Sequence, residues 1–289
     1  DQEELLKKYN KEDQAKLFVT KPLYQRAWIV FGGPLANFIL AILIFLFIYM
    51  FIGKDFTPAV IDEVQKDSPA EIAGMKKNDI ILEIDNNKVE SILDVSKFIA
   101  MSTSVFVDFK ISRYDNEILL KVKPNIVESE DNLGNKLKKR MVGIKLSPYN
   151  NEINHVKLGP FQAFIHSMNE VYFVTTSSLK YLGSMFIGKG DTSQLGGPIR
   201  IAKISGQVAE FGIIPFISMM AYISISLGLI NLFPIPMLDG GHLLMNFIEF
   251  INGGPLKRKY LEIAHTFGFF ILISLMIFAT YNDILRFFK

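Results

Sequence analysis

Cysteine is absent from the 289-residue sequence, so the domain expected on the outer side does not rely on disulfide bonds. A charge excess is absent too: 31 basic residues stand against 29 acidic ones, a net charge of +2. This near balance gives no reason to expect nucleic-acid binding, which needs a strongly basic surface. No internal repeat is visible, which counts against a transporter built from related halves. The chain begins with Asp1 and has neither an initiator Met nor a signal peptide, so we expect an N-terminal piece upstream of it.

Three long stretches contain no charged residue at all: 27–53, 211–238 and 263–282. Each has at least the roughly 20 residues that a helix needs to cross a hydrocarbon core of about 30 Å. The sequence therefore predicts three transmembrane spans.

Basic residues indicate how these spans are oriented, because they gather on the cytoplasmic side of membrane proteins. They cluster before the first span and between the second and third: Lys7, Lys8, Lys11, Lys16, Lys21, Arg26, Lys257, Arg258 and Lys259. We therefore expect residues 1–26 to form a cytoplasmic lead-in helix. The segment 54–210 and the C-terminus are expected on the outer side.

Residues 57–127 change to short apolar runs separated by turn signals, which is typical of a small β-rich domain. Strands are expected at 59–61, 80–84, 105–111 and 118–123, with a hairpin turn at 114–117. A short helix should follow Ser68 as its N-cap and end at Gly74.

The region 128–210 is expected on the outer side and combines a charged loop, a further strand at 141–146 and an amphipathic helix at 159–188. Polar residues interrupt the apolar ones in 159–188, so this helix is expected to lie on the outer membrane surface. A fourth span is the alternative. A glycine-rich turn is expected at 194–199.

The second apolar stretch contains the run Asn231-Leu-Phe-Pro-Ile-Pro-Met-Leu-Asp-Gly-Gly-His242. Pro234 and Pro236 each remove a backbone donor and break the helix. Asp239 then lies beside unwound chain near membrane depth, where a carboxylate is costly unless it is paired or binds a metal. The alternative is a solvated turn at the cytoplasmic interface. His242 suggests a metal pair with Asp239, or a local cap.

Two resemblances follow from these patterns. The run 68–89 resembles a PDZ domain of the permuted bacterial type, and such domains bind extended peptides at a sheet edge; a strand-rich domain without a ligand is the alternative. The run 231–242 resembles the NxxPxPxLDG motif of site-2 proteases, of the bacterial regulator-of-sigma-E protease type. Further matches lie in the family's order at Gly32-Gly33-Pro34 with Asn37, at 196–199 and at 253–255.

The site-2 resemblance implies an α-helical polytopic membrane protein with an inserted small β-rich PDZ domain. It also implies an intramembrane zinc metalloprotease with Asp239 as a zinc ligand. Asn231, Pro234, Pro236 and Asn37 are the implied substrate-binding residues. The family's other ligands and its general base belong to an HExxH helix, and none of the four histidines begins that motif. We therefore expect HExxH upstream, and no cleavage by this chain alone.

The implied function is cleavage of transmembrane segments in regulated intramembrane proteolysis. The expected partners are single-span membrane proteins such as anti-sigma factors, the lipid bilayer, and a peptide ligand of the PDZ domain. The expected location is the bacterial inner membrane, with the PDZ domain on the outer face. A catalytically silent PDZ-containing membrane scaffold is the alternative, and a transporter is a third hypothesis, because proline-broken helices also mark ion sites.

Overall fold

A computed structural model of the chain describes residues 10–14, 16–130, 136–149, 152–188 and 196–287. The chain divides into two compact units. The helical unit comprises Asp1–Phe45 and Gly196–Lys289, and the inserted unit comprises Leu46–Leu195. Most of the lead-in segment expected at 1–26 lies outside the described residues or outside a helix; within it, a helical turn spans Lys11–Gln14 (α2).

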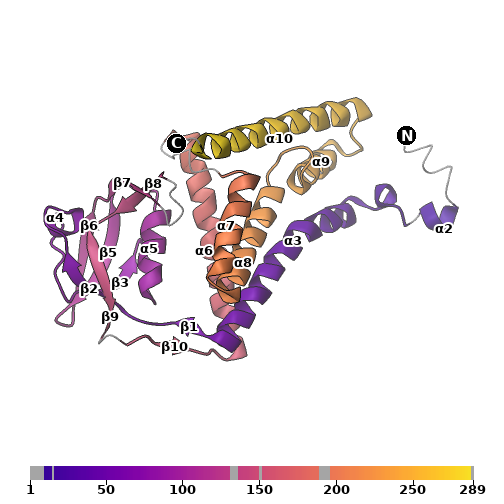
Figure 1. The fold of residues 1–289 in the computed structure, drawn as a ribbon. Coiled ribbons are helices and arrows are strands. Elements are labelled where there is room, and N and C mark those ends of the chain that lie inside the picture. The colour runs from indigo at the N-terminus through magenta and orange to yellow at the C-terminus, as the bar shows by residue number, and fades with distance from the viewer. Residues whose placement is uncertain (1–9, 15, 131–135, 150–151, 189–195, 288–289) are drawn as a thin grey trace. The chain divides into compact units, whose positions relative to one another are not determined.

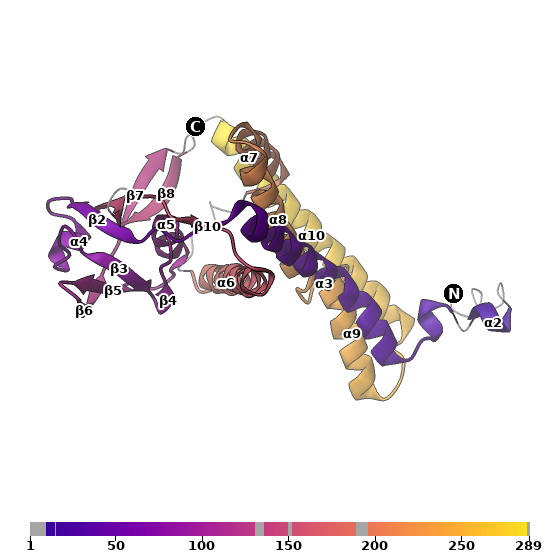
Figure 2. The same cartoon turned by 90° about the horizontal axis from the view of Figure 1, so that it is seen from below.

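The helices are α2 (Lys11–Gln14), α3 (Leu23–Phe47), α4 (Pro69–Ile72), α5 (Ile92–Met101), α6 (Pro160–Phe186), α7 (Pro198–Glu210), α8 (Ile213–Asn231), α9 (Asp239–Asn252) and α10 (Arg258–Phe287), with a 3-10 turn η1 (Phe18–Thr20) and a π-helical turn η2 (Ile48–Ile52). The strands are β1 (Lys54–Asp55), β2 (Ala59–Val64), β3 (Ile80–Ile84), β4 (Asn87–Lys88), β5 (Val107–Arg113), β6 (Asn116–Val122), β7 (Asn125–Glu130), β8 (Lys136–Met141), β9 (Ile144–Pro148) and β10 (His155–Val156). Figures 1 and 2 show their arrangement.

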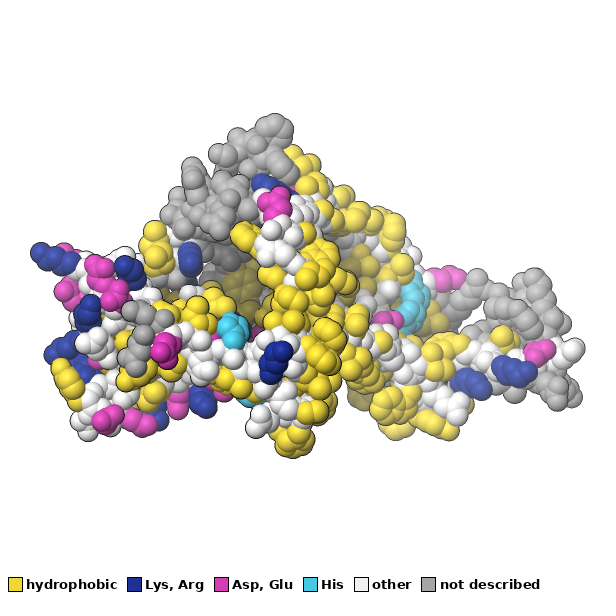
Figure 3. Space-filling model, turned by 60° about the horizontal axis from the view of Figure 1, so that its bottom comes forward, with side chains coloured by type: hydrophobic (Ala, Val, Ile, Leu, Met, Phe, Trp, Pro, Cys, Tyr) yellow, Lys and Arg dark blue, Asp and Glu magenta, His cyan; other side chains and the backbone are white. Residues whose placement is uncertain are grey.

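Three helices of the described chain are long and apolar enough to cross a membrane: Leu23–Ile52, Ile213–Asn231 and Lys259–Ile284. Their number confirms the prediction of three spans. The amphipathic helix α6 is not among them. In Figure 3, hydrophobic side chains gather over the helices, whereas charged side chains gather over the sheet domain.

The inserted unit is built on an antiparallel sheet with the strand order β6-β5-β3-β2-β9, and β4 pairs with β3. The hairpin β5–β6 closes through Tyr114 and Asp115, which both have positive φ. This matches the two-residue turn whose twist suits a hairpin. The expected Ser68 cap is present, since its Oγ accepts the N–H of Glu71 at 3.2 Å. The four strands expected within 57–127 and their hairpin are thus confirmed. The charged loop expected after residue 127 instead holds the paired strands β7 and β8, and the strand expected at 141–146 is β9 at Ile144–Pro148.

The sheet continues beyond residue 127, where the β-rich domain was expected to end. Strand β9 pairs with β2 from Ala59↔Pro148 to Val64↔Ile144. A local hydrophobic pattern does not reveal a pairing between strands so far apart in the chain.

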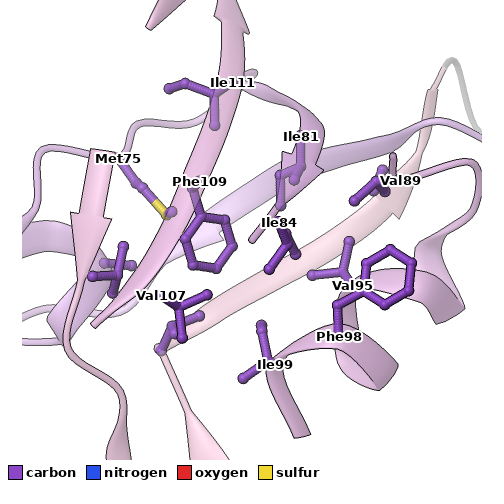
Figure 4. Close-up of a cluster of buried hydrophobic side chains, with 14 of the residues drawn as sticks. Met75, Ile81, Ile84, Val89, Val95, Phe98, Ile99, Val107, Phe109 and Ile111 are labelled. Carbon is purple, nitrogen blue, oxygen red and sulfur yellow. The ribbon is translucent and has the colours of Figure 1, made fainter. Parts of the chain in front are cut away.

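A single apolar core fills the space between this sheet and α5 (Figure 4). Phe109 is fully buried at its centre, with Ile84 and Val107 beside it. Val95 and Phe98 come from α5, whose N-terminus carries a capping box formed by Ser91 and Asp94.

Helix α6 belongs to the inserted unit and docks beside α5. The Lys97 ammonium lies 2.6 Å from the Glu170 carboxylate, and the rings of Phe98 and Phe173 lie 4.9 Å apart. The start of α6 is fixed near η2, because the Leu158 N–H donates to the Tyr49 carbonyl at 3.0 Å.

A second polar cluster joins the same elements. Lys54 of β1 forms an ion pair with Glu90, and its Nζ lies 3.3 Å from Nδ1 of His166 on α6. Strand β1 pairs with β10, which leads into α6. The inserted unit is therefore held together by charge pairs as well as by its core.

Candidate metal centre

The proline-rich segment interrupts the helical unit as its sequence predicts. Helix α8 ends at Asn231 and α9 begins at Asp239. Between them the chain turns tightly: the Leu238 N–H donates to the Ile235 carbonyl at 2.9 Å, and Met237 has a φ of 109°. A non-glycine residue with positive φ is strained and persists only where its surroundings hold it.

Three glycines allow the helices to pack directly against this broken backbone. A Cβ on Gly240 would collide with the carbonyls of Leu232 and Phe233, and one on Gly241 would collide with the carbonyl of Ile235. On α10, a Cβ on Gly268 would collide with the carbonyl of Pro236. Backbone at these three positions therefore supports the turn, and any larger residue would displace it.

Asp239 is the first residue of α9, and its carboxylate lies against the span α3. A Cβ on Gly33 would stand 2.8 Å from Asp239 Oδ2. Gly32, one residue earlier, has open space at the equivalent position. The glycine pair in α3 is thus not equivalent: Gly33 alone makes room for the carboxylate.

One turn further along α3, Asn37 meets α8. The Ser224 hydroxyl donates to the Asn37 main-chain carbonyl at 2.8 Å, and its oxygen is 3.5 Å from Asn37 Oδ1. A Cβ on Gly228 would lie 3.1 Å from the Pro34 carbonyl and 3.2 Å from the Asn37 Cβ. Small residues and a hydroxyl at a helix contact are typical of packing inside membranes. Helix α3 therefore meets both α8 and Asp239 within about one turn.

The other expected substrate-binding residues surround the break. Asn231 is half-buried at the end of α8, Pro234 is exposed, and Pro236 forms an isolated bridge with Leu238. The His242 ring lies 5.4 Å from the ring of His265 on α10. No local pattern signals this pairing, because the two histidines belong to different segments.

An ion pair holds the far end of α9. Arg26, at the start of α3, lies 3.0 Å from the Glu249 carboxylate, and both side chains are largely buried. In the sequence, Arg26 is one of the basic residues before the first span, and no local pattern marks Glu249 as its partner. Helix α9, which begins with Asp239, is thus fixed to α3 near both ends.

Asp239 is the residue of this site whose chemistry suits a metal, since carboxylate oxygens are ordinary zinc ligands. Across the described parts of the chain, no three His, Asp or Glu side chains come together as a metal-binding group. The described residues therefore do not form a complete zinc ligand set by themselves.

Comparison with known proteins decides the family. The family model described as Peptidase family M50 matches residues 5–275. The chain belongs to peptidase family M50. This confirms the resemblance to site-2 proteases. With its three apolar helices, the M50 chain is a membrane metalloprotease by family.

Named relatives match the M50 chain over nearly its whole length. A protein of Agrobacterium fabrum, provisionally named a zinc metalloprotease, is 37% identical over 273 residues, covering 94% of this chain and 72% of the relative. Metalloprotease MmpA of Caulobacter vibrioides is 30% identical, covering 94% of this chain and 71% of the relative. A protein of Rickettsia conorii, also provisionally named a zinc metalloprotease, is 32% identical, covering 99% of this chain and 79% of the relative.

Among solved structures, the PDZ domain of the SdrC-like protein from Listeria monocytogenes is similar to this chain. Its sequence is 22% identical, it covers 32% of this chain and 88% of its own, and the TM-score is 0.25.

Proposed function

We propose that this chain provides the aspartate half of an intramembrane zinc protease site, with Asp239 as a zinc ligand. The main support for this proposal is the position of the Asp239 carboxylate. It lies at the start of α9, directly after the proline-broken chain, and against Gly33 of the apolar helix α3. Broken backbone is tolerated at membrane depth where it is buried in protein or lines a wet cavity. A bound metal is one way to make a carboxylate favourable in such a place.

The remaining ligands and the general base are proposed to come from an HExxH helix outside this sequence, as the family resemblance implies. Zinc held by three protein ligands supplies an activated water for attack on a peptide carbonyl. In this arrangement Asp239 would be one of the zinc ligands, and its place at the start of α9 against Gly33 of α3 would fix the position of that carboxylate.

The proposed substrates are transmembrane segments of single-span proteins, anti-sigma factors among them, cut in regulated intramembrane proteolysis. A transmembrane helix hides its carbonyls in hydrogen bonds, so it must unwind before cleavage. Asn231, Pro234 and Pro236 offer an interrupted backbone and an amide close to Asp239 in the chain, which suit an extended substrate strand. Asn37 is proposed to act from α3, although Ser224 already engages its main-chain carbonyl.

The bacterial relatives support a location in the bacterial inner membrane, and the distribution of basic residues supports an orientation with the inserted unit on the outer face. On that side the PDZ-type domain would meet substrates first. Its edge strand β9 pairs only with β2 among the described strands. A free edge of this kind suits the addition of a peptide strand.

The test is Asp239→Ala in the full-length protein with its upstream segment. Zinc content of the purified protein and cleavage of a model single-span substrate should both be lost. Glu210→Gln, an exposed carboxylate at the end of α7, is the matched control and should change neither.

Undiminished zinc content and cleavage in Asp239→Ala would overturn the assignment. A wild-type full-length protein that binds no zinc and cleaves nothing would instead favour the catalytically silent scaffold.

A further inference from the structure

A buried carboxylate lies in the helical unit, away from the proline break. Asp283, near the end of α10, is 3% exposed. Its Oδ1 accepts the N–H of Gly197 at 2.9 Å and its Oδ2 accepts the N–H of Arg200 at 3.0 Å. Both donors belong to the N-terminal end of α7, so Asp283 caps that helix from another element.

This cap explains how a charged residue, Asp283, can be buried in the last apolar helix. The first N–H groups of a helix have no partner within it, and its N-terminus carries partial positive charge. A carboxylate that accepts two of these N–H groups is stabilised where an unpaired one would be costly. The N-cap residue of α7 is Gly197, which has no side chain to act as a cap, so α7 depends on Asp283.

Gly197 is fitted to this contact. A Cβ there would lie 2.7 Å from Asp283 Oδ2 and 3.0 Å from the Ala279 carbonyl. Gly206, on the same helix, has open space at the equivalent position. The close contact with α10 therefore requires glycine at position 197, whereas it does not require glycine at position 206.

In its first half, helix α10 also contacts the proline break, since Gly268 packs against the Pro236 carbonyl. Gly268 and Asp283 are far apart on α10, and at 1.5 Å per residue their separation is about 22 Å along a straight helix. Figures 1 and 2 show α7 beside the C-terminal end of α10 and joined to α8 by a short turn. One helix thus contacts both the beginning of α7 and the break that follows α8.

We propose that Asp283 is a positioning residue that anchors α7 to α10 and so fixes α8 and the Pro234–Asp239 turn for the proposed reaction. The chain passes from the inserted unit into the helical unit at Leu195/Gly196, immediately before this anchor. Asp283 thereby holds the first turn of α7 against α10.

The absence of cysteine makes a direct test simple. Two cysteines, at Ile201 of α7 and Phe270 of α10, are both exposed positions for spin labels in the full-length protein. The wild type should give one narrow distance distribution. Asp283→Ala should broaden or shift it, and Asp283→Asn, which keeps one acceptor oxygen, should fall between the two.

Two matched controls separate anchoring from general damage. Asn282→Ala alters the neighbouring residue, whose amide nitrogen is buried without a hydrogen-bond partner in the described chain, and should leave the distribution unchanged. Gly197→Ala should reproduce the broadening by pushing Asp283 aside, whereas Gly206→Ala should not. If Asp283→Ala does not fold, Asp283→Asn and Gly197→Ala still decide the question.

Cleavage activity provides a further measurement. This measurement, unlike the distances, rests on the proposed function. Asp283→Ala should lower the kcat for cleavage about tenfold while zinc content stays at the wild-type level, because Asp239 is untouched. Unchanged distances in Asp283→Asn, Asp283→Ala and Gly197→Ala would overturn the proposal. Distances that respond to Asp283, together with zinc that persists in Asp239→Ala, would overturn the proposed function and leave the anchor standing.

Discussion

The Asp239 carboxylate lies where a side chain on Gly33 would otherwise stand, with Oδ2 2.8 Å from the position of a Gly33 Cβ. Two segments from opposite ends of the chain therefore share one small volume. The glycine pair of α3 and Asp239 after the proline-rich segment are therefore parts of the same site.

Gly33→Ala tests this relationship. The added methyl group overlaps the carboxylate, so Asp239 must move, and zinc content and cleavage by the full-length protein should fall at least about tenfold. Gly32→Ala is the matched control, because a Cβ there meets nothing within 4 Å. Equal activity in the two variants would mean that Asp239 does not need its present position.

The Arg26–Glu249 pair should stabilise the helical unit. Glu249→Ala leaves the largely buried Arg26 without its counter-charge, which costs about 3–5 kcal/mol for a buried pair. The apparent melting temperature in detergent should drop. The exchange Arg26→Glu with Glu249→Arg should recover part of the loss, and a double variant no better than either single one would argue against a direct pair.

In the inserted unit, Arg113 is the counter-charge of a fully buried carboxylate. Its Nε and Nη2 donate to the two oxygens of Asp79, each at 2.7 Å. Arg113→Ala should lower the free energy of local unfolding of the sheet by about 3–5 kcal/mol. Hydrogen exchange of β3 and β5 amides measures this free energy. Lys77→Ala, which breaks a surface pair with Asp62, should cost less than about 1 kcal/mol. Similar losses would show that burial does not set the strength of these pairs.

The docking of α6 should weaken in acid. Burial, and after it the Lys54 ammonium, lower the pKa of His166 below its ordinary value. A group with a lowered pKa in the folded state stabilises it fully above the unfolded value of about 6.5, and this contribution is lost as the pH falls through the folded pKa. Burial raises the pKa of Glu90, but its ion pair with Lys54 outweighs this and lowers it, so Glu90 acts in the same direction at lower pH.

Hydrogen exchange of α6 amides between pH 7 and pH 5, corrected for intrinsic rates, is the measurement for this effect. Protection should decrease in the wild type and should change less in His166→Gln. His155→Gln, at an exposed histidine of β10, is the control and should follow the wild type. A steeper loss in His166→Gln than in the wild type would mean that protonation of His166 does not weaken the docking of α6.

Much of this arrangement could be predicted because its signals are local. Runs without charge predict spans, two prolines predict a break, and Ser68 predicts its cap, since each depends on neighbouring residues. The hairpin at Tyr114 and Asp115 is local in the same sense.

Contacts between distant segments have no such signal. The third span was predicted to end at Asn282 because the next residue, Asp283, is charged. Helix α10 continues to Phe287, and the Asp283 carboxylate accepts N–H groups of α7. Gly268 and Glu249 likewise have their roles only through partners far away in the sequence. The pairing of β9 with β2 belongs to the same class.

The pairing of β9 with β2 determines when the sheet can be completed during synthesis. Strand β2 is made soon after the first span, but its neighbour β9 follows only after the β7–β8 hairpin. The sheet is therefore incomplete while the intervening residues emerge, and non-local pairing of this kind slows folding. The sheet of the inserted unit can therefore close only once residues 144–148 have been made, well after the first span.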